Sequence, residues 1–389
     1  MPVLAELRRR GHQIALRTLA AETETMRRLG FDAAPVAAEV EALEMDDWRA
    51  KSRLGVWPRG LRVLGARAPL EARDLERAIA ANAPDVLIID VLAWGALAAA
   101  EAWGGPWACS CPFPLPIPSR DGPPAGPGFR PARGPLGRLR DRVAETLTDV
   151  GFDRFAGGPV TGVRAGVGLP PLTHARDLYT RAPLHLYMTA RPFEHRREDW
   201  PESIVMVGPC QWEPPGEMPP ELLGVAEPLV LVTTSSEFQN DGKLVKTALE
   251  ALADEPLHVV ATMPAAAARD LEVPANATVL PFAPHTPVLR RAACAVTHGG
   301  MGATQKALSL GVPVCAVPFG RDQFEVARRV ELVGAGRQLS PWRLRPTRLR
   351  AKVHEAIACR AGAERIGRAF AAAGGGAAAA DAVERRLLD

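Results

Sequence analysis

Short apolar runs alternate with amphipathic stretches along most of the chain. In the first half, the apolar run at 86–89 lies between helical patterns at 75–81 and 93–103. In the second half, the runs at 229–233 and 293–297 alternate with helical patterns in the same way. Continuous apolar strands between amphipathic helices are typical of parallel sheets covered on both faces. The pattern therefore predicts an α/β protein with two Rossmann-like, doubly wound parallel-sheet domains in series.

The individual elements follow from the same periodicities. Strands are predicted at 13–19, 85–90, 107–111, 229–233, 257–261, 277–280, 293–297 and 313–317. Helices are predicted at 23–29, 75–81, 93–103, 139–155, 243–253, 286–291, 302–310 and 323–333.

Proline and glycine divide the chain into larger units. Residues 112–137 are dense in both, which predicts a long loop or mobile lid over the ligand site. A stretch rich in Pro, Glu and Trp at 201–228 predicts an extended linker between domains. The predicted units are an N-terminal domain at 1–205, a linker at 206–227, a C-terminal domain at 228–370 and a last helical segment at 371–389. In that segment an Ala/Gly tract, 371–380, is expected to be a flexible joint before a helix that packs back on the N-terminal domain.

Composition narrows the class of protein. With 389 residues, 47% hydrophobic and 23% charged, the chain is expected to form two or three globular domains. Its net charge of +3 is spread along the sequence, which argues against a nucleic-acid partner. The longest uncharged run, 102–119, contains five prolines and cannot form a membrane-spanning helix. No secretory signal is evident, and six scattered cysteines form no zinc pattern, so a cytoplasmic protein with reduced thiols is expected.

The most informative stretch is a strand that ends in a Gly-rich turn and opens a helix, Ala295 to Thr304. Unpaired N–H groups at a helix N-terminus bind anions, and glycines let a diphosphate approach the main chain. His298 could add a donor to a phosphate oxygen, or could merely cap the turn. A dinucleotide fingerprint is a weaker interpretation, because Gln305 replaces its third glycine and Asp322 lies several residues past the next strand.

Several spaced motifs resemble one family. They are the turn from His298 to Gly302, the pair Asp322-Gln323, the segment Phe282 to His285, Val207 to Pro209, and Arg328 to Val330. Together they resemble the donor-site signature of nucleotide-sugar-dependent glycosyltransferases with the GT-B fold. The sequence looks most like the bacterial antibiotic and macrolide glycosyltransferases of the UDP-glycosyltransferase family, densely from about 205 to 340.

The resemblance implies a donor site in the C-terminal domain, with the acceptor in the N-terminal domain across a cleft. Phe282 would stack on the nucleobase, the alternative being core packing, and Asp322 and Gln323 would bind sugar hydroxyls, although Asp322 could equally cap a helix. Lys306 stands where most members carry a Glu that holds the ribose hydroxyls, so the identity of the nucleotide is open. The donor-binding residues implied are Ser236, Phe282, Ala283, His298, Gly300, Met301, Gly302, Ala303, Asp322 and Gln323.

The resemblance also implies inverting transfer of a hexose or deoxyhexose. With no Asp-x-Asp motif, no metal and no cofactor beyond a UDP- or TDP-linked sugar are expected. The family's general base is a His shortly before a Pro that matches Pro2, so here it would precede Met1, and Asp90 matches the acid that orients it. A helix-first α/β domain also lacks a strand that should be central in its sheet. We therefore expect the natural protein to begin further upstream.

The acceptor is expected to be a hydrophobic small molecule, a natural product. Trp48, Trp94 and Phe113, with the loop after 112, are weak candidates for its pocket, because most such aromatic residues are simply core. Two other classes stay open: a nucleotide-sugar-binding protein without catalysis, and an NAD-dependent oxidoreductase. An epimerase would need paired acids that the sequence does not identify. The acceptor, the sugar and the oligomeric state are left open.

Overall fold

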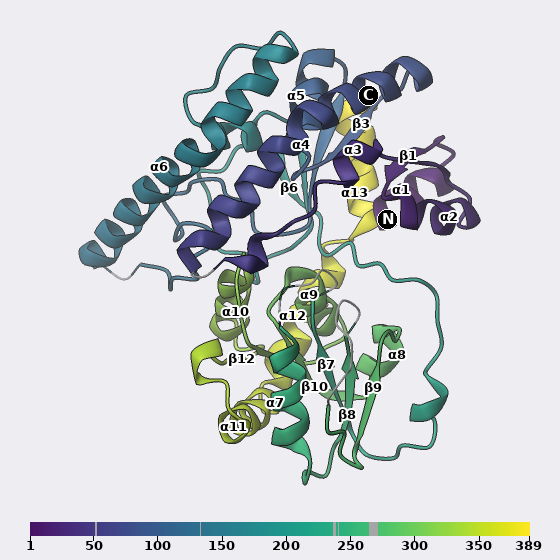
Figure 1. The fold of residues 1–389 in the computed structure, drawn as a ribbon, viewed down its shortest axis with the longest axis vertical. Helices are drawn as coiled ribbons and strands as arrows, with labels where there is room; N and C mark the ends of the chain where they lie inside the picture. Colours follow the sequence, from purple (N-terminus) through teal and green to yellow (C-terminus); the bar gives the residue numbers. More distant parts are fainter. Residues whose placement is uncertain (51–52, 133, 236–238, 240, 264–270) are drawn as a thin grey trace.

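The computed structural model describes residues 1–50, 53–132, 134–235, 239, 241–263 and 271–389, and has two α/β halves stacked along its long axis (Figure 1). All of the strand pairs in both halves are parallel among the described residues. The predicted fold class, two parallel-sheet domains, is confirmed.

The C-terminal half is built on one six-stranded sheet in the order β12-β11-β10-β7-β8-β9. Chain order reverses between the two central strands, β7 and β10, and ligands bind at such a switch point beyond the carboxyl ends of the strands. The strands are β7 (Leu229–Thr233), β8 (His258–Thr262), β9 (Ala277–Leu280), β10 (Ala292–Thr297), β11 (Val314–Ala316) and β12 (Gly336–Gln338).

Helices cover both faces of this sheet because successive strand residues point to opposite sides. One core joins the strands to α7 (Gly242–Leu252) and α11 (Pro346–Ile357). The other joins them to α8 (His285–Arg290), α9 (Met301–Ser309), α10 (Gln323–Leu332) and α12 (Arg360–Ala372). Ala190 and Phe193, which come before the predicted linker, also pack into this second core.

The N-terminal half has a four-stranded sheet and a separate two-stranded one. β3 (Leu87–Asp90), β4 (Trp107–Cys111), β5 (Leu184–Tyr187) and β6 (Ile204–Met206) pair in chain order, while β1 (Ala15–Thr18) pairs only with β2 (Asp32–Pro35). Among the described residues, β3 is therefore an edge strand. Its sheet packs one face on α4 (Arg53–Asn82), α5 (Trp94–Trp103) and α6 (Gly134–Gly166). Smaller helices are α2 (Ala20–Arg28) and α3 (Ala38–Glu41).

The two ends of the chain meet on the other face of that sheet. There α1 (Pro2–Arg9) and α13 (Gly376–Val383) share a core with β4 and β5. Arg10 binds the carboxylates of Asp381 and Glu384, each at 2.6 Å. The C-terminal segment thus passes from one half of the molecule to the other (Figure 1).

Three sequence-based expectations were wrong in extent or kind. The predicted helix at 75–81 is the end of the 30-residue α4, which tolerates Pro58 and Pro69 inside it. The helix predicted at 139–155 is the 33-residue α6, which contains Pro159. The Ala/Gly tract at 371–380 is not a flexible joint: only the turn at 373–375 interrupts the helices. Alanine is the best helix former, so a polyalanine stretch stays helical until glycines with positive φ turn the chain.

In the part of the chain that is described, no helix is long and apolar enough to cross a membrane.

Candidate functional site

The Gly-rich turn lies between β10 and α9, at the switch point of the C-terminal sheet. Thr297 Oγ1 accepts a hydrogen bond from the Gly299 N–H at 3.0 Å, and Gly299 has a φ of +84° that favours glycine. A Cβ at Gly300 would collide with the His298 imidazole. A Cβ at Gly302, in contrast, would meet open space. The first turn of α9 therefore leaves room for a ligand beside its N–H groups.

His298 sits in the wall of this turn as a buried, neutral imidazole. Its side chain is buried, and among the described residues no group forms a hydrogen bond with Nδ1. Burial lowers its pKa, an effect that the charge of Asp241 partly offsets. A buried polar atom without a partner is costly. The unpartnered Nδ1 therefore leaves one hydrogen-bonding position open in the wall of the turn.

A second loop faces the turn from the end of β7. The Ser235 N–H donates to Asp241 Oδ2 at 2.7 Å, which fixes the start of α7. The Gln239 side chain donates to Ser235 Oγ at 2.6 Å. Ser236, predicted to bind the donor, lies outside the described residues. Met301, another predicted donor residue, has its side chain in the core, so only its main chain can face a ligand.

Asp322 and Gln323 begin α10 beside the same turn. Burial raises the pKa of Asp322 to about 6. Its carboxylate makes no capping hydrogen bond with the helix, which was the alternative role for it. The Gln323 carboxamide is engaged: its oxygen accepts from the N–H groups of Phe319 and Gly320, and its nitrogen donates to Gln239. The Asp322 side chain is thus less engaged in hydrogen bonds than the Gln323 side chain.

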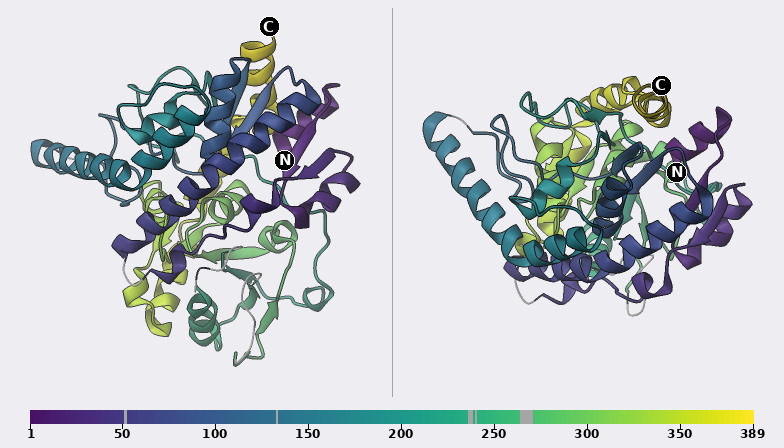
Figure 2. Two further views of the ribbon diagram at one scale, coloured as in Figure 1. Left: turned by 45° about the horizontal axis from the view of Figure 1, so that its top comes forward. Right: turned by 90° about the horizontal axis from the view of Figure 1, so that it is seen from above.

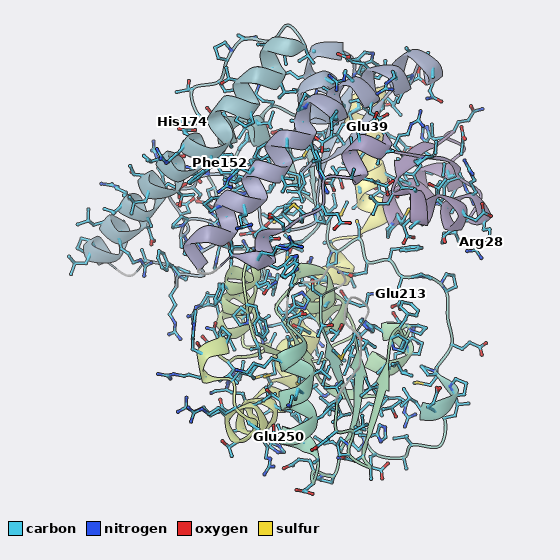
Figure 3. The ribbon with its side chains drawn as sticks, in the orientation of Figure 1. Arg28, Glu39, Phe152, His174, Glu213 and Glu250 are labelled. Carbon is cyan, nitrogen blue, oxygen red and sulfur yellow. The ribbon has the colours of Figure 1, made fainter. Side chains whose placement is uncertain are left out.

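The predicted nucleoside side of the site is formed by the segment before α8. The Phe282 ring is 58% exposed, so it does not pack in the core, and a base could stack on it, whereas Ala283 is buried. Glu213, on the linker, accepts hydrogen bonds from the His285 and Thr286 N–H groups, both at 2.9 Å. Its carboxylate also pairs with Lys306 Nζ at 3.0 Å. The side chain of Glu213 lies at the end of the C-terminal half that faces the other half (Figure 3).

In the N-terminal half, Asp90 ends the edge strand β3. The Asp90 side chain reaches solvent and accepts the Leu92 N–H at 2.9 Å, yet the protein around it raises its pKa. Glu71 on α4 lies near enough for the two charges to interact, and burial raises the pKa of Glu71 to about 7. No sequence pattern singles out Glu71, because its surroundings depend on how α4 packs on α5.

The three predicted acceptor aromatics differ in their surroundings. Trp94 is fully buried in the core and donates from Nε1 to the Tyr179 hydroxyl at 2.8 Å, so its placement in a pocket was wrong. Phe113 packs against the cores of both halves. Trp48 is partly buried and follows Asp47, whose carboxylate binds Arg321 of the other half through two hydrogen bonds of 2.7 Å.

Sequence reasoning missed the contacts that join the halves. Arg329 on α10 pairs with Glu194, which follows β5, and with Glu325 on its own helix; all three side chains are buried. Glu194 also accepts from the Tyr187 hydroxyl. The loop that contains Gly126 also contacts α10, because the Gly126 N–H donates a hydrogen bond to the Glu325 carboxylate at 2.6 Å. Charged residues so far apart in sequence carry no pattern that would have revealed them.

Comparisons with known proteins agree with this architecture. The C-terminal domain of erythromycin biosynthesis protein CIII-like proteins matches residues 246–383. The 4'-demethylrebeccamycin synthase of Lentzea aerocolonigenes is 31% identical over 377 residues, 92% of this chain and 88% of that protein. An uncharacterized UDP-glucosyltransferase of Bacillus subtilis, YojK, is 32% identical over 207 residues, which is 51% of this chain and 51% of that protein.

Solved structures extend the likeness over the whole chain. The glycotransferase of kitacinnamycin superposes with a TM-score of 0.78 at 26% identity, covering 99% of this chain and 94% of that one. The glycosyltransferase VinC, solved in complex with DTDP, shares the fold, with a TM-score of 0.72 at 22% identity over 100% of this chain and 95% of that one. The chain therefore belongs to the antibiotic and natural-product glycosyltransferases of the GT-B fold.

Proposed function

We propose that the protein transfers a hexose or deoxyhexose from a UDP- or TDP-linked sugar to a hydrophobic small-molecule acceptor, with inversion at the anomeric carbon. The observation that carries the proposal is the turn from His298 to Gly302. It combines an unpartnered imidazole nitrogen, open space at Gly302 and the start of α9 at a switch point. These features suit a diphosphate.

The proposed donor site uses groups on three loops. Phe282 would stack on the base, and the Ala283 main chain would meet the base edge. The N–H groups of Gly300, Gly302 and Ala303, with His298, would hold the diphosphate and stabilise its growing charge as it leaves. Asp322 would accept hydrogen bonds from sugar hydroxyls, since its carboxylate makes no capping bond with α10. The chain's own donors thus carry the leaving-group charge in a reaction proposed to need no metal.

On the acceptor side, we assign Asp90 a positioning role. A carboxylate that binds one nitrogen of an imidazole fixes its tautomer and lets the other nitrogen take a proton from an acceptor hydroxyl. Asp90 ends an edge strand and reaches solvent, so it is accessible to such a partner.

Calorimetry and turnover together test the proposal. We expect titration with UDP-glucose and TDP-glucose to show binding, and NMR of the products from an α-linked donor to show β-glycosides of apolar phenols or macrolide aglycones. Asp90→Asn should lower turnover with little change in donor affinity. Donor binding without turnover would favour the non-catalytic alternative, and nicotinamide dinucleotide binding without sugar-nucleotide binding would favour an oxidoreductase.

A further inference from the structure

A strained arginine stands immediately before Asp322, in the turn that leads into α10. Arg321 has a φ of +50° and is one of two non-glycine residues with positive φ in the described part of the chain. A side chain in this left-handed region costs conformational energy that a glycine would avoid. Strain of this kind gathers at functional sites, where the surrounding contacts hold the backbone in place. The contacts of Arg321 therefore indicate what the strain serves.

Arg321 reaches across the junction to the N-terminal half. Its Nε and Nη2 atoms each donate to the carboxylate of Asp47 at 2.7 Å, and the Asp47 side chain is only 4% exposed. A guanidinium that binds both oxygens of a carboxylate is fixed in direction as well as in distance. Figure 1 and the left view of Figure 2 show the start of α4, which follows Asp47 in the chain, beside the C-terminal half. The pair thus ties the turn before α10 to the N-terminal half.

Asp47 is itself held firmly. It belongs to a short 3₁₀ turn, η1 (Asp47–Arg49), that packs on α4. The preceding residue, Asp46, pairs with Arg59 of α4 at 2.7 Å. The N-terminal half therefore presents the Asp47 carboxylate from an anchored segment, and the carboxylate can restrain the cation that binds it.

Within the C-terminal half, Gln323 closes the turn on both sides of Arg321. Its carboxamide oxygen accepts hydrogen bonds from the N–H groups of Phe319 and Gly320. Its own N–H donates to the Gly320 carbonyl at 3.1 Å. These bonds hold the two ends of the turn, whereas Asp47 holds the strained residue between them. Because Asp322 comes next in so short a turn, a change in the Arg321 backbone carries the Asp322 carboxylate with it.

The charge of Arg321 also acts on two groups of the proposed donor site. Burial raises the pKa of Asp322 to about 6, and the charge of Arg321 opposes this rise. Burial lowers the pKa of His298, and the charge of Arg321 lowers it further. Arg321 therefore lies within electrostatic reach of both the sugar side and the diphosphate side of the proposed site.

We propose that Asp47 is a positioning residue for the donor sugar: by holding Arg321 in its left-handed conformation, it fixes the Asp322 carboxylate toward the sugar hydroxyls. The inference rests on the proposed function, which gives Asp322 that contact. The N-terminal half then completes the sugar subsite of the C-terminal half. The nucleotide depends on other loops, with Phe282 at the base and the Gly-rich turn at the diphosphate, so its affinity should not need Asp47.

Calorimetry with UDP and with UDP-glucose separates the sugar from the nucleotide, and TDP with TDP-glucose serves where the wild type prefers them. We expect Asp47→Asn to weaken UDP-glucose binding about 5- to 10-fold and to leave UDP binding within about twofold of wild type. The matched control is Asp46→Asn, whose carboxylate is 40% exposed and pairs within its own half. This control should bind both ligands as the wild type does. Circular dichroism checks that all forms fold alike.

A double-mutant cycle tests the route through Arg321. If Asp47 acts through Arg321, adding Asp47→Asn to Arg321→Gln should not change the ratio of UDP-glucose affinity to UDP affinity any further. An Asp47→Asn effect that persists in full in the Arg321→Gln background overturns the proposal. Equal weakening of both ligands, which a merely structural role predicts, or wild-type binding by Asp47→Asn also overturns it. A wild-type chain that binds neither nucleotides nor nucleotide sugars would instead contradict the proposed function, and this inference with it.

Discussion

His298 ties donor binding to pH. Burial lowers its pKa, so the free site holds a neutral imidazole near pH 7. A bound diphosphate favours the protonated form, so the complex holds more protons than the free protein, and affinity for UDP-glucose should rise several-fold between pH 8 and pH 6. A nucleotide sugar is the right probe, because its diphosphate diester does not itself titrate in this range.

The matched variant is His298→Asn, which keeps a short polar side chain without a titrating group. We expect its affinity for UDP-glucose at pH 7 to be about 10- to 100-fold weaker, the value of one hydrogen bond to a charged group. The increase in UDP-glucose affinity from pH 8 to pH 6 should also disappear in this variant. Calorimetry at both pH values measures this, and a slope that persists in the variant would assign the pH dependence to another group.

The pair Lys306–Glu213 should respond unequally to the loss of each partner. Glu213→Gln leaves the ammonium of Lys306, with its side chain only 14% exposed, without an ion partner. Lys306→Met leaves a carboxylate that still accepts two backbone N–H groups at the start of α8. We expect Glu213→Gln to lower the free energy of unfolding by about 1–3 kcal/mol and Lys306→Met by less than about 1 kcal/mol. Urea titration measures both, and the reverse order would contradict this account.

At the scale of elements, the loop before α6 should control the start of α10. Gly128 has a φ of +69°, and a Cβ there would overlap the Phe324 carbonyl. Gly134 has a φ of +77°, but a Cβ there would meet nothing. Both alanine variants carry backbone strain of about 1–2 kcal/mol, yet only Gly128→Ala should push α10 and Asp322 out of place. We therefore expect about tenfold weaker donor binding for Gly128→Ala and wild-type binding for Gly134→Ala, as measured by calorimetry.

Elements that follow a strict period could be predicted from sequence, and those that depend on tertiary packing could not. The strand at 229–233 and the turn at 298–302 are signalled by local chemistry, an apolar run and a glycine cluster. The long α4 and α6 contain prolines that argue for breaks, and their packing on neighbouring helices outweighs that cost. Trp94 shows the same limit at a site, since an aromatic residue at a helix start can face a ligand or the core, and only the packing decides.

For the whole molecule, the junction between the halves depends on a buried ion cluster. Arg329 on α10 pairs with Glu194, and both contact the hydroxyl of Tyr187, the last residue of β5, so the cluster joins a helix of one half to a strand end of the other. The charge of Arg329 lowers the pKa of Glu194 against the opposing effect of burial. The ion pair therefore stabilises the fold fully above the ordinary pKa of glutamate. This contribution is lost as the pH falls through the lowered pKa of Glu194.

Replacing Arg329 should reveal how much the free energy of unfolding depends on this ion pair and on pH. Arg329→Met leaves the buried Glu325 carboxylate without this cation and leaves Glu194 with Arg197, 3.3 Å away, as its remaining cation. The variant should lower the free energy of unfolding at pH 7 by about 3–5 kcal/mol. Near pH 4 the difference from wild type should shrink, because Glu194 can then take a proton in the variant and be buried neutral. Arg328→Met, one residue away and partly exposed, should cost about 1 kcal/mol or less at either pH. Urea unfolding followed by circular dichroism measures all three forms. An Arg329→Met loss that is the same at both pH values would mean that packing, and not charge, joins the halves.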